Sequence, residues 1–544
     1  MTSYEKVRSN GAWISSRPVK ILLLIFLLGP PFLLICIETI VEQRGRELTS
    51  TILDKLSFDS LSSSNKSITT SSNETITSSS TSSSNVTTKN NVSSEDDCPC
   101  YSRCEQDSLR RPSRIHSLPP ALSTALAAYE RMHSSCYHSR DLSKAIQAPD
   151  PNDPCRYLVF LQDGKFGLGN HILSLLSAFV YSLLTNRMLL VDTRNHIPEL
   201  FCEPFRNSSW LLPPDFPYDR LLLAPMLADG LKQKFRHGST VHLMLLSQQT
   251  PQEQLFFCPD TQTRLEKVRW IGWSSNQYYV PRFFTFPRFW RPLVSLFPDV
   301  SLTFTHLSRY LILPQNPVWE KIRRYHFAYS SLVQGKAVGV QIRRRENAEF
   351  HEPTYRRTMQ CLVENGLVPS VSESGHDIPA DKGQHQSRKN RTKVFVTSLQ
   401  SRYYEELRNT YINKPTVDGS LVRVHTMSHD EVESQSYEQV RNALAEMWLL
   451  SLSDELVTSS WSTFGYVAQG LGALRPYILN IKGDFGKDGL PACSLGQSIE
   501  PCNQFPFSSV CERNETADLE HSEWIKAHIR PCQDEPSGIQ LIQD

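Results

Sequence analysis

Short apolar runs alternate with longer stretches of helical periodicity between residues 156 and 481, and this alternation limits the fold more than any other feature. RYLVFLQ at 156–162 is typical of a buried strand, HILSLLSAFVYSLLTNR at 171–187 has apolar residues at helical spacing, and RMLLVD at 187–192 is a second strand candidate. Parallel strands need a crossover connection of this kind, so the three segments predict a strand–helix–strand unit. We therefore predict an α/β fold.

A second series of strand candidates follows the helical stretch at 318–333, so we predict two α/β units. A length of 544 residues also exceeds what one ordinary core accommodates. We place the first unit at 98–334, the second at 335–500 and a cysteine-containing C-terminal segment at 501–544. Residues 367–392 are polar and predict a long surface loop. The further strand candidates are 241–246, 268–273, 337–343, 393–399, 421–427, 455–460 and 476–481, and the clearest helix between them is 443–454.

The N-terminal region predicts a membrane anchor and a stem. Residues 21–37, ILLLIFLLGPPFLLICI, carry no charge and reach the short end of a bilayer-spanning helix. Basic residues precede this segment, which by the positive-inside rule places the N-terminus in the cytosol. A cleaved signal peptide is the alternative, but no small-x-small cleavage pattern follows. We assign 1–20 to a cytoplasmic tail, 21–41 to a transmembrane signal-anchor and the Ser/Thr-rich 42–97 to a disordered stem.

Sequons and cysteines favour a luminal location for the folded part. Thirteen cysteines are present: Cys36 lies in the apolar segment and the other twelve lie beyond it. In an oxidising lumen most of the twelve are expected to form disulfides. The alternative is a zinc site at Cys98, Cys100 and Cys104, although the spacing is unusual for one. The net charge of +1 gives no indication of a nucleic-acid partner. The seven N-x-Ser/Thr sequons are at Asn65, Asn73, Asn85, Asn91, Asn207, Asn390 and Asn514.

Glycines follow the first predicted strand, where an open α/β sheet binds its ligands. Gly164, Gly167, Gly169 and Asn170 open the next helix, so a ligand or its phosphate can approach the backbone there. The spacing differs from the dinucleotide motif G-x-G-x-x-G. A tight strand-to-helix turn without a ligand explains these glycines equally well.

The strand VGVQIRRRE at 338–346 ends in three arginines. An arginine at the carboxyl end of a strand can hold a phosphate through two parallel hydrogen bonds, and Arg343 is in that position. The alternative is a solvated charge cluster or an ion pair with Glu346, and we assign Arg344 and Arg345 to it.

The segment SSWSTFG at 459–465 follows another strand candidate. Ser462 and Thr463 offer hydroxyls, Gly465 leaves room, and the amides of a helix that starts there favour an anion. The same residues would serve an N-capped helix packed in the core, and both interpretations can hold together. The chain has no D-x-D pair to hold a divalent metal. We therefore predict that Arg343 and helix amides neutralise phosphate without a metal.

Several segments together carry a family resemblance. They are CRYLVF, GLGNHILSLLSAFVYSLLTNRMLLVD, LFCEPF, SSWLLP, HLSRYL, NPVW, VGVQIR and EMWLLSLSDELVTSSWSTFGYVAQGLGALRP. Across roughly residues 120–535 the chain resembles the plant cell-wall fucosyltransferases typified by xyloglucan α-1,2-fucosyltransferase. The resemblance implies a GT-B fold with two Rossmann-like domains facing a cleft, an acceptor-side domain at 98–334 and a GDP-sugar-binding domain at 335–500. It also implies an inverting transfer of L-fucose from GDP-L-fucose, without a metal or other cofactor.

The resemblance also implies the roles of particular residues. Arg343 would bind the donor diphosphate, and it is the residue that we expect to act in catalysis. The turn that contains Ser462 would contact the phosphate and the ribose, and His425 would lie near the nucleotide. The full set of implied donor-binding residues is Arg343, His425, Ser462, Thr463, Phe464, Gly465, Gly167, Gly169 and Asn170.

The same resemblance implies a single-pass type II protein of the Golgi membrane with a luminal catalytic domain. The acceptor would be a hydroxyl, the galactose 2-OH, of a cell-wall polysaccharide or a glycoprotein glycan. The implied partners are thus a GDP-sugar, a glycan and the Golgi membrane. A homodimer or a complex with other Golgi transferases stays open.

The chain departs from the family pattern at three places. His171 stands where Arg usually follows G-L-G-N, and residues 426–429 replace Q-P-S-H. Asn276 stands near the position of an Asp that is a candidate catalytic base. The alternative hypothesis is therefore a catalytically weak or inactive member that binds glycan or scaffolds other Golgi enzymes. A transferase for a different GDP-sugar is a third hypothesis.

Overall fold

The computed structural model describes the folded part of the chain, from residue 98 to residue 543 with gaps. Val92–Asp544 form one compact unit. The expected tail, signal-anchor and stem, residues 1–97, lie outside the described residues, as do residues 373–390 of the expected loop. The described ranges are 98–150, 152–162, 164–233, 235, 238–246, 250–330, 335–344, 351–372, 391–428, 435–481, 489–506, 511 and 518–543.

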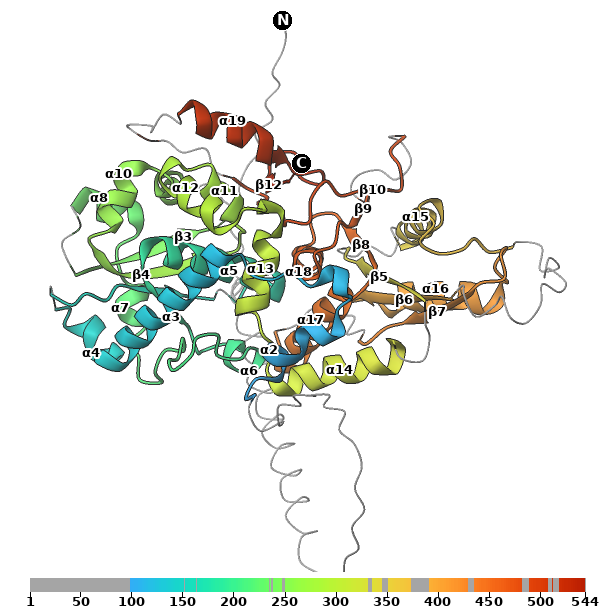
Figure 1. Ribbon diagram of the computed structural model, residues 1–544, viewed down its shortest axis with the longest axis horizontal. Helices are drawn as coiled ribbons and strands as arrows, with labels where there is room; N and C mark the ends of the chain where they lie inside the picture. Colours follow the sequence, from blue (N-terminus) through green and yellow to red (C-terminus); the bar gives the residue numbers. More distant parts are fainter. Residues whose placement is uncertain are drawn as a thin grey trace, which may run out of the picture. The chain divides into compact units, whose positions relative to one another are not determined.

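Within these ranges, four strands form a parallel sheet in the order β2-β1-β4-β3, here called the first sheet (Figure 1). Its strands are β1 Tyr157–Phe160, β2 Met188–Val191, β3 Ser239–Leu245 and β4 Val268–Ser275. Both faces are covered, which explains why β1 is a continuous apolar run. Leu158 packs into a core with residues of α3 (Pro120–Ser139) and α5 (Leu168–Thr185). Tyr157 packs into another with residues of α4 (Leu142–Gln147) and α7 (Asp219–Leu222).

A six-stranded second sheet has the order β10-β9-β8-β5-β6-β7 in the described part of the chain. All its neighbouring strands are parallel except β10, which runs antiparallel to β9. The strands are β5 Lys336–Ile342, β6 Arg391–Ser398, β7 Leu421–His425, β8 Glu455–Ser459, β9 Tyr477–Leu479 and β10 Cys493–Leu495. A short hairpin near the C-terminus pairs β11 Ile529–Pro531 with β12 Ile539–Leu541.

The α/β prediction is confirmed, since every strand candidate of the sequence corresponds to one of β1–β9. Helices fill the intervals. Those up to residue 311 are α2 Tyr101–Glu105, α3 Pro120–Ser139, α4 Leu142–Gln147, α5 Leu168–Thr185, α6 Ile197–Leu200, α7 Asp219–Leu222, α8 Leu227–Gln233, α9 Pro251–Phe256, α10 Pro259–Leu265, α11 Val280–Phe284, α12 Pro287–Leu296 and α13 Thr303–Leu311. The later ones are α14 Asn316–Ser330, α15 His351–Glu364, α16 Ser401–Asn413, α17 Tyr437–Ser451, α18 Thr463–Gly472 and α19 Leu519–His528.

Helix α5 is the central helix of the first sheet. Among the described residues it is the one helix long and apolar enough to cross a membrane, and 78% of its apolar window is buried inside the protein. It is therefore a core helix here. It begins after Gly167 and ends at Asn186, whose left-handed backbone (φ 50°) stops the helix.

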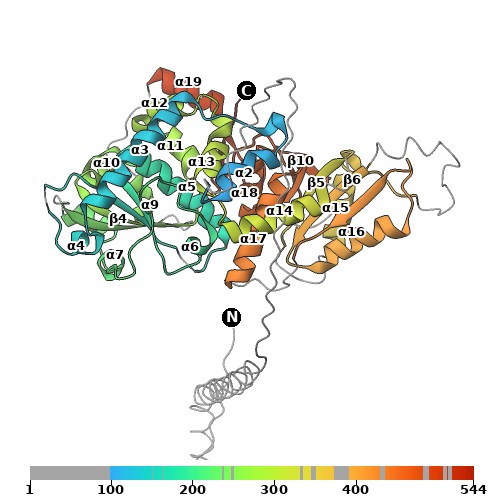
Figure 2. The ribbon, with the colours of Figure 1, turned by 60° about the horizontal axis from the view of Figure 1, so that its bottom comes forward.

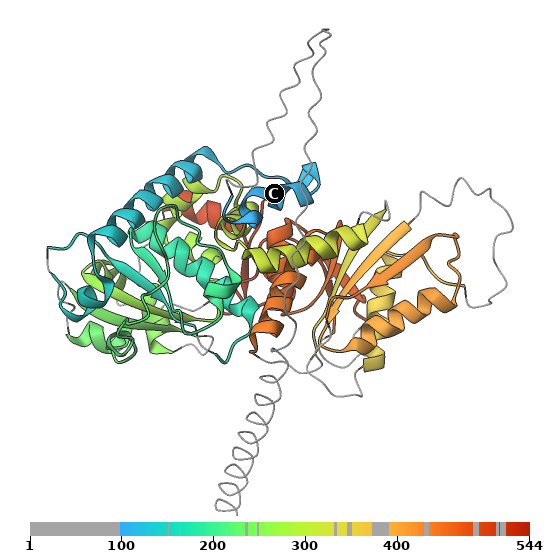
Figure 3. The same ribbon diagram turned by 90° about the horizontal axis from the view of Figure 1, so that it is seen from below.

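Two helices of the later part of the chain, α17 and α18, pack with the first sheet and its helices. Their buried residues, among them Trp448 and Val467, belong to the same hydrophobic cluster as β1 and α5. Trp448 also meets Trp319 of α14 edge-to-face, with ring centroids 5.3 Å apart. Figures 2 and 3 show α14 and α17 beside each other between the two sheets. The expected boundary at 334/335 stays a prediction. One hydrophobic cluster contains residues from both sides of it, whereas the core of the second sheet is a separate cluster.

The expectation that the cysteines beyond the apolar segment pair as disulfides is confirmed. Cys98, Cys100 and Cys104 all form S–S bonds, which excludes the zinc site as an alternative. In the described residues the pairs are Cys98–Cys104, Cys100–Cys202, Cys136–Cys155, Cys258–Cys511, Cys361–Cys493 and Cys502–Cys532.

Candidate functional site

Arg343 follows β5 at the carboxyl edge of the second sheet and is half-buried. Its backbone N–H donates to Ser459 Oγ at 2.7 Å, so the end of β5 is tied to the end of the neighbouring strand β8. Gln341, two residues earlier on the same strand face, accepts from the Ser459 N–H through Oε1 at 3.3 Å. Arg343 therefore stands at the edge where parallel sheets bind ligands.

The turn after β8 lies directly against this strand end. Ser462 is the N-cap of α18, and its Oγ accepts from the Gly465 N–H at 3.4 Å. A Cβ on Gly465 would lie 2.9 Å from the Thr458 side chain and 3.3 Å from Gln341 Oε1. Only glycine allows this close approach. The turn thus lies beside the end of β5, and the N-terminus of α18 stands at this sheet edge.

Arg344 has a structural partner. Its Nη1 donates to the carbonyl oxygen of Ile481, just beyond β9, at 2.5 Å. The guanidinium therefore joins β5 to a more distant strand end. Arg343 and Arg344 thus have different surroundings. The backbone of Arg343 is bonded to Ser459, just before the turn 462–465, whereas the guanidinium of Arg344 is bonded to Ile481.

The C-terminal segment holds the same turn from the other side. Trp461 has a left-handed backbone (φ 65°), which is strained for a large side chain, and 44% of it is exposed. An Asp534 carboxylate oxygen accepts from the Trp461 N–H at 2.8 Å and from the Tyr466 hydroxyl at 2.7 Å. Gln504 Nε2 donates to the Trp461 carbonyl oxygen at 3.3 Å. Sequence reasoning missed Trp461 and Asp534, because their contact spans more than 70 residues.

The glycine turn before α5 meets this turn directly. Thr463 Oγ1 donates to Asn170 Oδ1 at 3.1 Å, and Asn170 Nδ2 donates to the Asn276 carbonyl oxygen at 3.1 Å. A Cβ on Gly169 would lie 2.8 Å from the Thr463 carbonyl carbon. Gly169 thus allows the N-termini of α5 and α18 to touch. The structure thus places the turn 462–465 against Gly169 and Asn170, and the backbone of Arg343 at the neighbouring strand end, while the donor-binding roles of these residues stay predictions.

Asn276 is buried directly after β4, at the carboxyl edge of the first sheet. Two residues later, the Tyr278 hydroxyl donates to Glu500 at 2.9 Å, and the Phe304 N–H donates to the same carboxyl at 2.5 Å. Complete burial raises the pKa of Glu500 well above its ordinary range. This carboxyl is enclosed by the protein and supports the segment that contains Asn276.

His425 ends β7, which is the edge strand of the second sheet and is separated from β5 by β6. Its ring packs on Tyr329 with centroids 4.2 Å apart. Burial, together with Arg423 and Lys393, lowers its pKa. Its Nε2 is buried and has no hydrogen-bond partner among the described residues. His425 thus lies two strands away from Arg343, and its role near a nucleotide stays a prediction.

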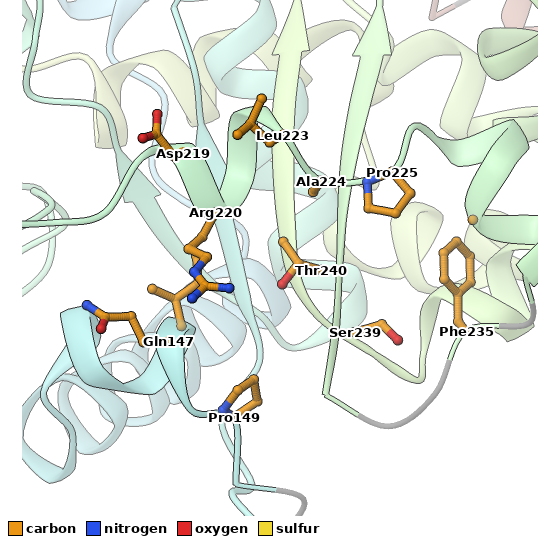
Figure 4. Close-up of a pocket in the computed structure, with 12 residues that line it drawn as sticks. Gln147, Pro149, Asp219, Arg220, Leu223, Ala224, Pro225, Phe235, Ser239 and Thr240 are labelled. Carbon is orange, nitrogen blue, oxygen red and sulfur yellow. The ribbon is translucent and has the colours of Figure 1, made fainter.

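A cavity of about 430 Å³ lies next to the glycine turn, at the carboxyl ends of β1 and β2. It extends to Gln435 and Val440 near the start of α17. A larger cavity, about 720 Å³, lies where β3 begins and is lined by Arg220 and Thr240 among others (Figure 4). Since ligands of open α/β sheets bind at carboxyl ends, the smaller cavity is the better candidate. In the described ranges, no group of three or more His, Cys, Asp or Glu is close enough to hold a metal ion.

Comparison with known proteins identifies the class. The chain matches the family model of xyloglucan fucosyltransferase over residues 64–512. It is 35% identical over 470 residues to galactoside 2-alpha-L-fucosyltransferase of Arabidopsis thaliana, covering 83% of this chain and 82% of that protein. The galactoside 2-alpha-L-fucosyltransferase of Pisum sativum is 35% identical over 443 residues, covering 78% of this chain and 76% of that protein.

A solved structure agrees with these matches. A mutant of Arabidopsis thaliana FUT1 in complex with GDP is 33% identical, with a TM-score of 0.71, covering 83% of this chain and 98% of that one. The fold and these similarities together define an enzyme of the fucosyltransferase class. The chain belongs to the xyloglucan fucosyltransferase family, and the resemblance seen in the sequence is confirmed.

Proposed function

We propose that this protein transfers L-fucose from GDP-L-fucose to the 2-OH of a galactose in a cell-wall polysaccharide or a glycoprotein glycan. The observation that carries the proposal is the place of Arg343, tied by its backbone to Ser459 beside the N-terminus of α18. The two sheets would be the two Rossmann-like domains of a GT-B enzyme, with the donor bound at the second sheet. Relatives named as galactoside 2-alpha-L-fucosyltransferases support the choice of acceptor.

Electrostatics support the assignment of the donor. When the bond from fucose to GDP breaks, negative charge develops on the diphosphate and positive charge on the sugar. A guanidinium at position 343 and the first amides of α18 would stabilise the developing diphosphate charge. Asn170 Oδ1 accepts from the Thr463 hydroxyl at 3.1 Å and thereby holds the first residue of α18 in place. These groups would supply the neutralisation that a divalent metal supplies in other enzymes, so we propose that no metal is required.

Inversion requires that the acceptor hydroxyl attack the fucose from the side opposite to GDP. That hydroxyl must lose its proton, to a base or through water. The amide of Asn276 cannot accept a proton as an aspartate would. Glu500 is completely buried and accepts from Tyr278 and Phe304, so its proposed part is to support the neighbouring segment. Leaving-group stabilisation thus falls to Arg343 and the first residues of α18.

The cellular setting is part of the same proposal. The uncharged segment 21–37, the Ser/Thr-rich stem and the disulfides suit a type II protein of the Golgi membrane with its catalytic part in the lumen. A glycosylation scan of full-length chains would test the orientation. Sequons that acquire glycans place residues beyond 41 in the lumen, and their complete failure to do so would contradict it.

The activity is tested with the full-length protein in detergent, labelled GDP-fucose and galactose-ended acceptors, including xyloglucan, in the presence of a metal chelator. We expect transfer that the chelator leaves unchanged and a product with an α-linked fucose on the galactose 2-OH. Tight GDP binding without transfer to any acceptor would support the inactive, glycan-binding alternative instead. Transfer only from a different GDP-sugar would overturn the choice of donor.

A further inference from the structure

The cavity of about 430 Å³ has both polar and apolar walls and lies between the first sheet and α17. Its volume falls within the range of about 300–1,000 Å³ that small-molecule sites occupy. It lies at the carboxyl ends of two neighbouring parallel strands, β1 and β2, as sheet-bound ligands do. The polar residues that line it include Gln162, His171, Asp192, Arg194 and Gln435.

An ion pair is fixed in the wall of this cavity. Arg194 Nε donates to both carboxylate oxygens of Asp192, at 3.0 and 3.2 Å, and Nη2 donates to one of them at 2.7 Å. The Asp192 side chain is 3% exposed and that of Arg194 is 48% exposed. The guanidinium also lies over the ring of Tyr218, 3.9 Å from its centroid. Stacking and the carboxylate together hold Arg194 in one orientation, so little side-chain entropy is lost when it binds a ligand.

The other polar groups of the wall are neutral donors and acceptors. Gln162 Nε2 and His171 Nδ1 are 2.5 Å apart, and His171 is almost fully buried. Gln435 Nε2 donates to the Phe166 carbonyl oxygen at 3.4 Å, so the α17 side of the cavity is linked to the glycine turn. These groups are held by the protein before any ligand arrives.

The charge of the cavity distinguishes its ligand from the donor. With histidines neutral, the lining contains one acid, Asp192, and one base, Arg194, so its charges cancel. An anionic diphosphate gains little from a balanced pair, because attraction to the guanidinium is offset by repulsion from the carboxylate. An uncharged polyhydroxyl ligand loses nothing and can use both the donors and the acceptors of the wall. The wall therefore favours a neutral sugar.

The cavity is also next to the turn proposed for the donor. His171 follows Asn170, which accepts from the Thr463 hydroxyl at the start of α18. A sugar in the cavity would therefore lie beside His171, the residue next to Asn170, where the edges of the two sheets meet. We propose that this cavity binds an uncharged sugar of the acceptor glycan and that Arg194, fixed by Asp192, is a specificity-determining residue for it. The proposal rests on the proposed transferase function and assigns the acceptor side of the same site.

The first experiment compares the full-length protein with Arg194→Gln in steady-state transfer assays. Loss of a hydrogen bond from a charged group should raise the acceptor KM by about tenfold or more. The KM for GDP-fucose should change by less than about twofold. Arg402→Gln is the matched control, because Arg402 is also an exposed arginine paired with one carboxylate, on α16, away from the cavity. Equal KM values for the acceptor in the two folded variants would overturn the proposal, as would a rise confined to the GDP-fucose KM.

A second measurement separates this proposal from the proposed function. Binding of GDP and of lactose, as a galactose-ended probe, is measured by calorimetry and ligand-observed NMR on the wild type, Arg194→Gln and Asp192→Asn. The Asn substitution keeps the shape of the side chain and removes its charge, so it tests the pair if Arg194→Gln does not fold. We expect weaker lactose binding with unchanged GDP binding. Weaker GDP binding with unchanged lactose binding would place the donor in the cavity and overturn the proposal. Absence of transfer with GDP and lactose still bound would refute the proposed function while supporting the sugar site.

The ionic strength provides an independent readout. If the cavity receives a neutral sugar, the acceptor KM should stay within about twofold when salt is raised from about 0.05 to about 0.5 M, because screening acts only on charged partners. The KM for GDP-fucose should rise several-fold over the same range. An acceptor KM that rises in parallel with the donor KM would contradict a neutral ligand.

Discussion

The carboxyl edges of the two sheets differ in charge although both are formed by parallel strands. The edge of the second sheet has Arg343 beside the hydroxyl turn at 462–465. The edge of the first sheet has Asp192 and Arg194, whose charges cancel within one ion pair. The residues that follow the strands thus determine the chemistry of each edge. A net positive edge suits a diphosphate, and a balanced edge suits a neutral sugar.

The largest effect should come from removing the positive charge of the second edge. Arg343→Ala should lower kcat by about 100-fold to 1,000-fold, the typical result of losing a donor that stabilises developing charge. Initial rates at saturating GDP-fucose measure this. Arg344→Ala is the control, since Arg344 binds the Ile481 carbonyl and should affect stability more than catalysis. If Arg343→Ala kept more than about a tenth of the wild-type kcat, the donor assignment would be wrong.

Short apolar runs in the sequence, such as 156–162, predicted the strands of both sheets, because the strands of a parallel sheet are generally buried on both faces. Gly465 was singled out because it leaves room beside a helix start, and in the structure the side chains of Thr458 and Gln341 approach that position. The positions of Arg343 and Ser462 follow from the ends of β5 and β8, which the sequence also marks.

Contacts between distant parts of the chain could not be predicted in this way. The pairing Cys258–Cys511 joins residues 253 apart, and many pairings are compatible with the same set of cysteines. Asp534 supports Trp461 through a backbone contact that no motif indicates. The Asp192–Arg194 pair is local, yet its importance depends on a cavity that also needs α17. Sequence periodicity places residues on elements, whereas the site depends on how these elements meet.

The contact between the two edges provides the next test. Gly169→Val should disturb the contact with Thr463, because even a Cβ would lie 2.8 Å from its backbone. Overpacking of this kind typically costs about 1–3 kcal/mol of stability. Because it would also displace the start of α18, kcat/KM for both substrates should fall roughly 10- to 100-fold, the typical cost of a small misplacement of reacting groups. Gly339→Ala is the control, because its Cβ would be equally close, 2.8 Å, to Ser453 Oγ inside the second sheet. If both variants lose stability equally and activity equally, the contact has no specific role.

A smaller effect on activity should come from replacing Ser462, the N-cap of α18, which lies beside the proposed donor site. Ser462 and Ser436 are N-caps whose Oγ atoms accept from the N–H of the third following residue, both at 3.4 Å. Replacing either by Ala should lower the free energy of unfolding by about 1 kcal/mol, measured in urea. Only Ser462→Ala should also raise the KM for GDP-fucose, by about tenfold, the result of losing a hydrogen bond to a charged group. Equal KM values in the two variants would limit Ser462 to capping.

The smallest effect concerns His425, which lies at the far edge strand of the second sheet. Its Nε2 is buried without a partner among the described residues, so a nucleotide base could satisfy it. His425→Phe keeps a ring against Tyr329 and should raise the KM for GDP-fucose about two- to tenfold, the net worth of one neutral hydrogen bond. The acceptor KM should not change. An unchanged KM for GDP-fucose would show that His425 only packs against Tyr329. The residues that bind the donor would then be limited to those that follow β5 and β8.

The same variant makes a prediction for stability against pH. The pKa of His425 is lowered in the folded protein by burial, Arg423 and Lys393, whereas in the unfolded chain it should be about 6.5. Between these two pKa values the unfolded chain binds more protons, so the folded state loses stability as the pH falls through about 6.5. His425→Phe should remove that part of the loss, seen as a smaller decrease in Tm between about pH 7 and 5. Because no group at the balanced edge of the first sheet is involved, Arg194→Gln should leave this decrease as it is in the wild type, and a matching change in both variants would show that the two edges titrate together.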